Sequence, residues 1–188
     1  KQTYLDNIMR GGYPITFSHP EKSNHQQTVF YLYSRKHGDL ERDYNKFQLA
    51  ATYFSQGNGN YRDMNQNRRC GIWFNPDIND ESVITFFNLL QADGFNPLVF
   101  KGLSFVLKDS AEFKKALGDI VEDNALAKMV SFLNKPFTPG EVILFIAENK
   151  IKLRVSYDKF LDILLSHCLK NQETEHGEGF WTDHWHYN

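Results

Sequence analysis

The sequence predicts a mainly α-helical protein that contains a small segment of four helices. Residues 82–90 are apolar on nearly all sides at helical spacing, which is typical of a helix buried on most sides. Thr138-Pro139-Gly140-Glu141 resembles a capping box with proline at the first helical position. Helical periodicity also predicts amphipathic helices near residues 110–118, 123–134, 139–149 and 156–169.

These four helices indicate how the chain is organised. Their apolar positions are enough for one small shared core, and they carry little of the amide-rich chemistry found elsewhere. We therefore interpret residues 108–171 as an inserted helical segment. Residues 1–107 and 172–188 flank it and hold the polar clusters described below.

The flanking parts contain several shorter predicted elements. A short strand is expected at residues 13–17, and residues 28–34 are β-branched and aromatic, which fits a buried strand or the start of a helix. Residues 47–54 follow helical spacing and are followed by glycines. Residues 98–107 are expected to be extended with an interruption at Lys101-Gly102, and residues 171–175 to form a polar exit from the last helix.

Composition excludes several classes of function. The formal net charge of -2 gives no electrostatic argument for binding nucleic acid or an anionic membrane. The sequence has no run of about 20 apolar residues, so no transmembrane helix is expected. Two cysteines are too few for a disulfide framework, which favours a reducing, cytoplasmic location.

Because the chain begins at Lys1 and stops within an aromatic and polar cluster, we expect it to be part of a longer polypeptide.

The most polar stretch lies at residues 57–69. It reads Gly-Asn-Gly-Asn-Tyr-Arg-Asp-Met-Asn-Gln-Asn-Arg-Arg, and only Tyr61 and Met64 interrupt its glycines, amides and charges. In a helix after Tyr61 the polar side chains would cover two neighbouring faces, so such a helix is not expected to hold a core. The two faces are Asp63, Gln66 and Asn67, and Arg62, Gln66 and Arg69.

The side chains of this stretch suit ligands that carry hydroxyl groups. Their planar amide, carboxylate and guanidinium groups supply both hydrogen-bond donors and acceptors, which adjacent hydroxyls require. A solvated surface helix or a polar loop is the alternative interpretation of the same pattern.

A second cluster, at residues 176–188, reads His-Gly-Glu-Gly-Phe-Trp-Thr-Asp-His-Trp-His-Tyr-Asn. Its tryptophans offer flat surfaces for the apolar faces of sugar rings. A carboxyl group against tryptophan, Asp183 or Glu178, would have its neutral form favoured by desolvation, as a general acid in glycoside cleavage requires. Metal binding through His184 and His186 is a weaker alternative, since no HExxH or CxxC spacing supports it.

At these two clusters the sequence resembles the carbohydrate phosphorylases of the cellobiose and β-glucan phosphorylase group, and most of all its large bacterial cellobiose phosphorylase-like members. The resemblance covers mainly residues 29–102 and 177–188. The family's Arg-Asp-x-x-Gln-Asp motif reads Arg62-Asp63-Met64-Asn65-Gln66-Asn67 here, with Asn67 in place of the final acid. The family's Trp-x-Asp element matches Trp181-Thr182-Asp183, and the residues that follow depart from the usual Trp-Asn-Asp.

The resemblance implies an (α/α) toroid catalytic domain, with residues 1–107 and 172–188 as parts of it and residues 108–171 as the insert. It implies an inverting enzyme that cleaves or makes β-glucosidic bonds of oligosaccharides with inorganic phosphate, without a metal or an organic cofactor. Asp183 would be the catalytic acid. The glucosyl unit would be bound by Arg62, Asp63, Gln66, Asn67 and Trp181.

This mechanism needs only one carboxyl group. An inverting hydrolase needs a second carboxylate to activate water, whereas phosphate is already an anionic nucleophile. The phosphate-binding residues are expected beyond residue 188, in the remainder of the longer polypeptide, so the chain alone is expected to be inactive. The alternatives are a non-catalytic carbohydrate-binding or scaffold region and a hydrolase on the same toroid.

Overall fold

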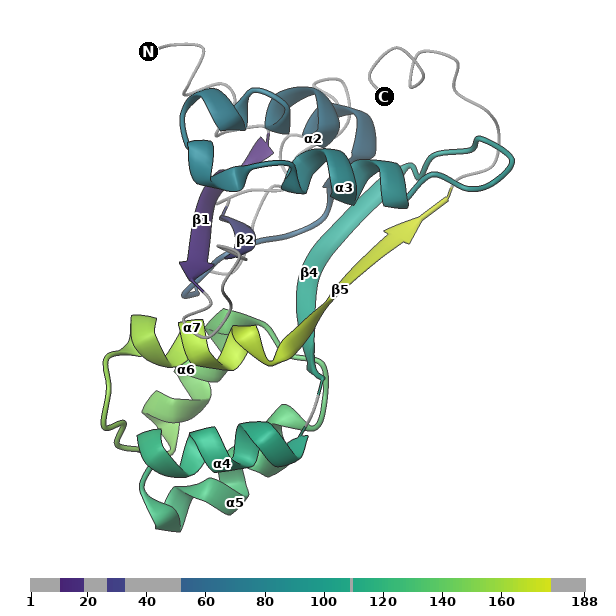
Figure 1. Cartoon of the computed structure of the whole chain (residues 1–188). Helices are drawn as coiled ribbons and strands as arrows, with labels where there is room; N and C mark the ends of the chain where they lie inside the picture. Colours follow the sequence, from purple (N-terminus) through teal and green to yellow (C-terminus); the bar gives the residue numbers. More distant parts are fainter. Residues whose placement is uncertain (1–10, 19–26, 33–51, 109, 177–188) are drawn as a thin grey trace.

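The structure is a computed structural model that describes residues 11–18, 27–32, 52–108 and 110–176 (Figure 1). Within these residues, three strands precede two short α-helices, and a long strand, four helices and a final strand follow. A long ribbon of two strands connects a group of short helices to a lower group of four helices (Figure 1).

Two small antiparallel sheets are present in the described residues. In the first, β1 (Tyr13–Ser18) pairs with β2 (Gln27–Leu32). In the second, the order is β3 (Gly59–Asn60), β4 (Val99–Leu107) and β5 (Cys168–Glu175). The interruption expected at Lys101-Gly102 is confirmed, because the register of β4 against β5 shifts between Phe100 and Leu103.

The expected mainly α-helical fold, a part of an (α/α) toroid, is wrong for the described residues, whose fold is mixed α and β. The aromatic and β-branched residues of β2 form a strand and not a helix. Residues 168–175, expected to be the end of a helix and a polar exit, form β5. This strand is mostly polar, and its conformation is set by antiparallel pairing with β4. In this pairing Lys170 lies opposite Phe105, far earlier in the chain.

Four helices follow β4 and precede β5: α4 (Ser110–Ile120), α5 (Asp123–Leu133), α6 (Pro139–Glu148) and α7 (Tyr157–Ser166). They confirm the four amphipathic helices expected from periodicity. The capping box is also confirmed, because Thr138 Oγ1 accepts a hydrogen bond from Glu141 N at 3.2 Å and a Glu141 carboxylate oxygen accepts one from Thr138 N at 2.7 Å. None of the helices in the described part of the chain is long and apolar enough to cross a membrane.

The core has two clusters that meet at β2. Phe30 packs with α4–α7 in the larger cluster, whereas Val29 and Tyr31 pack in the smaller one with residues of the short helices and β4. Successive side chains of a strand point to opposite faces, so one strand contributes to both cores. The smaller cluster holds Val29, Tyr31, Tyr61, Met64, Ile78, Phe86 and Phe100.

Helix α3 (Glu81–Asn88) is less buried than its sequence predicts. Phe86 lies in the smaller core, but Val83, Ile84 and Phe87 are 60%, 48% and 52% exposed. The expectation of burial on most sides is therefore wrong, because within the described residues α3 contacts the rest of the chain mainly through the face that carries Phe86.

Candidate functional site

The polar stretch of the sequence forms α2 (Tyr61–Arg68), directly after β3. Two hydrogen bonds fix its first turn: Tyr61 N donates to Leu98 O at 3.0 Å, and Arg62 N donates to the N-cap side-chain oxygen of Asn60 at 3.0 Å. The helix is therefore held at the edge of the β3–β4–β5 sheet, close to where β4 begins.

One side of α2 is buried, contrary to the expectation that this helix could not hold a core. Tyr61, Met64, Asn65 and Arg68 are all buried, at the i, i+3, i+4 and i+7 spacing of a helix face. The Tyr61 hydroxyl donates to Phe86 O at 2.9 Å, and burial raises the pKa of Tyr61 to about 12. The spacing of Tyr61, Met64 and Arg68 is the signal in the sequence that could have revealed this face.

Arg68 is a site residue that the sequence analysis missed. Its guanidinium carbon lies 3.8 Å from the centroid of the Tyr31 ring and 5.0 Å from that of Phe100. Its Nε donates to Gly11 O at 2.7 Å, so a buried cation joins the start of the described chain to α2. Gly11 allows this approach, because a Cβ atom there would lie 3.2 Å from side-chain atoms of both Arg68 and Asn67.

The other side of α2 carries the residues predicted to bind a glucosyl unit. Arg62, Asp63, Gln66 and Asn67 are all partly exposed, and we call them the outer side of α2. Arg62 Nη2 lies 3.3 Å from Asp63 Oδ1, and Asn67 Nδ2 donates to Asp63 O at 2.6 Å. The structure thus brings together four of the six predicted site residues on one rigid helix.

The predicted acid Asp183 and the predicted sugar-binding Trp181 lie outside the described residues. Glu178, the alternative acid, and His184 and His186, the alternative metal ligands, also lie outside them. Among the residues that the structure does describe, no three His, Cys, Asp or Glu side chains are grouped so that they could hold a metal ion.

A cavity of about 240 Å³ opens between α3, β4 and β5, and we call it the α3–β4–β5 cavity. It lies against the buried side of α2, since Arg68 is part of its wall and the four residues of the outer side are not. Nothing in the sequence indicated it, because its walls come from segments far apart in the chain. Its polar lining residues are Gln56, Arg68, Glu81, Ser82, Thr85, Asn88, Lys101, Lys170 and Gln172.

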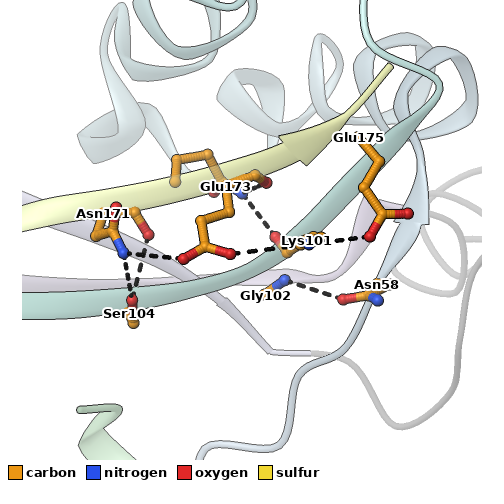
Figure 2. Close-up of polar contacts among 8 residues, drawn as sticks. Asn58, Lys101, Gly102, Ser104, Asn171, Glu173 and Glu175 are labelled. Carbon is orange, nitrogen blue, oxygen red and sulfur yellow. Dashed lines mark hydrogen bonds and ion pairs between the residues drawn. The ribbon is translucent and has the colours of Figure 1, made fainter. Parts of the chain in front are cut away.

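Charged and amide side chains hold the β4 bulge beside this cavity (Figure 2). Lys101 Nζ lies 2.9 Å from Glu175 Oε1 and 3.8 Å from Glu173 Oε2, and the hydrogen bond to Glu175 raises the pKa of Lys101. Gln172 Nε2 donates to Lys101 O at 2.6 Å. Gln56 Oε1 accepts from Leu103 N at 2.8 Å and its Nε2 donates to Leu103 O at 2.6 Å, so the side chain takes the place of a neighbouring strand.

Comparisons of the chain with protein-family models, curated proteins and solved structures found no match. The arrangement of the outer side of α2 is therefore the basis for a proposal about function.

Proposed function

We propose that the chain supplies the glucosyl-binding part of an inverting glycoside phosphorylase that acts on β-glucosidic bonds of oligosaccharides with inorganic phosphate. The observation that carries this proposal is the grouping of Arg62, Asp63, Gln66 and Asn67 on one side of α2. Four planar groups with donors and acceptors at helical spacing match the adjacent hydroxyls of a pyranose ring.

The buried side of α2 supports the same proposal. A binding site works best when its residues stand on a rigid element, because little conformational freedom is then lost when the ligand binds. The Tyr61 hydrogen bond to Phe86 O and the contacts of Arg68 with Tyr31 and Phe100 fix the helix that carries the outer side.

In the proposed reaction Asp183 protonates the glycosidic oxygen while phosphate attacks the anomeric carbon from the opposite face. The outer side of α2 holds the glucosyl unit, with Trp181 against the ring. No metal or organic cofactor takes part. The partners are the oligosaccharide, phosphate and the remainder of a longer polypeptide, without nucleic acid or membrane, and the proposed location is the cytoplasm.

Sugar binding without catalysis is the second candidate function. The observation that favours it is the outer side of α2, whose hydrogen-bonding groups are suited to holding hydroxyls. The two candidates differ in what they predict for Asp183→Asn in the longer polypeptide. A phosphorylase loses phosphate-dependent formation of glucose 1-phosphate but keeps cellobiose binding, whereas turnover unchanged by this substitution removes Asp183 from the catalytic role.

Sugar binding itself is tested on the chain with two arginine variants. Arg62→Ala is expected to weaken cellobiose binding roughly tenfold or more in calorimetric or NMR titrations, the loss typical of a hydrogen bond to a charged group. Arg154→Ala is the matched control, because Arg154 is exposed and lies between α6 and α7, outside α2. Equal affinities for the two variants would contradict the proposal.

A further inference from the structure

The α3–β4–β5 cavity has the composition of a small binding site. Tyr31, Phe86 and Phe100 line it, and the Phe86 and Phe100 ring centroids lie 5.3 Å apart. The two phenylalanine rings are tilted by 34° to each other and give the cavity an apolar wall, which can contact the C–H faces of a sugar.

The remaining wall supplies neutral hydrogen-bonding groups. Its hydroxyl groups belong to Tyr31, Ser82 and Thr85, and three amides complete the set. The Tyr31 and Ser82 hydroxyls bond to each other at 3.0 Å and Thr85 donates to Glu81 at 3.0 Å, so these hydroxyls offer a ligand their remaining acceptor positions. Asn88 has no side-chain hydrogen bond within the described residues and is exposed, so its amide can serve a ligand at the mouth of the cavity. The amide residues are Gln56, Asn88 and Gln172.

The charges around the cavity are balanced. Three cations line it, and three carboxylates lie on or beside its wall. Lys101 pairs with Glu173 and Glu175, and Lys170 pairs with Glu81 (Figure 2 shows the Lys101 group). Balanced charges give little net attraction for an ion, so a neutral ligand with hydroxyl groups fits this wall better than a phosphate or a carboxylate.

The volume limits the size of the ligand. At about 240 Å³ the cavity is slightly smaller than the sites that hold drug-sized molecules, which begin at roughly 300 Å³. A single sugar ring fits that space, whereas an oligosaccharide would extend out of it.

We propose that the α3–β4–β5 cavity binds one neutral sugar ring, as a second carbohydrate site on the opposite side of α2 from the outer side. The choice of a sugar as the ligand class rests on the proposed function. The position, size and charge balance of the cavity do not depend on it.

The test is an NMR titration of the chain with methyl β-glucoside, in which backbone amide shifts report where the probe binds. The proposal predicts saturable shifts, with an affinity in the millimolar range, at residues 81–89, 100–103 and 170–172. Asn88→Leu removes one hydrogen-bonding group from the cavity and is expected to weaken this binding about fivefold, the loss typical of one net hydrogen bond. Gln91→Leu is the matched control, because it makes the same kind of change at an exposed position outside the lining.

The proposal would be overturned by the absence of shifts around the cavity, or by equal weakening in Asn88→Leu and Gln91→Leu. Glucose 6-phosphate is the second probe, and tighter binding of this anion at the cavity would also contradict a neutral ligand. Arg62→Ala separates the two sites. It is expected to remove shifts at the four residues of the outer side of α2 and to leave those around the cavity, so failure of the proposed function and failure of this inference give different patterns.

Discussion

At the scale of single residues, Arg68 shows how a polar sequence can still build a core. Its buried guanidinium group contacts the Tyr31 and Phe100 rings. Its Nε donates a hydrogen bond to Gly11 O, 57 positions away in the chain. Helical spacing alone predicts that Asp63, Gln66 and Asn67 lie close together. It cannot predict the partners of Arg68, because Gly11, Tyr31 and Phe100 are brought to it only by the tertiary fold.

Arg68→Ala is expected to lower the free energy of unfolding by about 2–4 kcal/mol, since it removes two cation–π contacts, a hydrogen bond and buried packing. Arg69→Ala, at the exposed neighbouring position, is expected to change it by less than about 0.5 kcal/mol. Urea denaturation of both variants measures the difference, and similar values for the two would show that Arg68 does not organise this core.

At the scale of elements, the local signals of the sequence identify helices better than strands. Capping residues and apolar spacing lie within each helix, so α4–α7 and the Thr138 capping box were predictable. The strand β5 has little apolar periodicity of its own, and its partner β4 lies on the far side of the four helices. Its identity as a strand depends on a pairing that no short window contains.

Two helix glycines give a prediction at this scale. A Cβ atom at Gly140, in the first turn of α6, would lie 2.1 Å from the Tyr53 carbonyl oxygen, whereas one at Gly118 in α4 would meet nothing within 4 Å. Gly140→Ala is therefore expected to destabilise the protein by about 1–3 kcal/mol. Gly118→Ala is expected to stabilise it by roughly 0.5–1 kcal/mol, because alanine favours a helix interior. Thermal and urea unfolding test both, and a Gly140→Ala variant as stable as the unchanged chain would refute the close contact between α6 and the Tyr53 carbonyl.

At the scale of the whole molecule, the resemblance to carbohydrate phosphorylases implied a toroid, and the structure instead places α2 and α3 over a small sheet. The helical insert was predictable as a group of helices from its own core. The relation of that group to the rest of the chain was not, because it depends on β2, whose alternate residues enter two different cores.

Stability of the whole molecule is expected to fall at alkaline pH. Burial raises the pKa of Cys168 to about 12 from 9.0 and that of Tyr61 to about 12 from 10.0. Both groups are held in their neutral forms in the folded state. Their contribution to the free energy of unfolding is therefore fully present below about pH 9 and is lost as the pH rises from there toward 12. Between pH 9 and pH 11 the free energy of unfolding should fall by roughly 2–4 kcal/mol.

Urea denaturation at several pH values measures this fall. In Cys168→Ala the part of the decrease that begins near pH 9 should be smaller than in the unchanged chain. A free energy of unfolding that stays constant or rises between pH 9 and pH 11 would contradict the burial of these two groups.

The central claim is that the outer side of α2 binds a sugar, and the most direct measurement is a map of backbone amide shifts on adding cellobiose. The account predicts saturable shifts at Arg62, Asp63, Gln66 and Asn67, which Arg62→Ala abolishes. Shifts that leave these four residues unchanged at saturating cellobiose would contradict it.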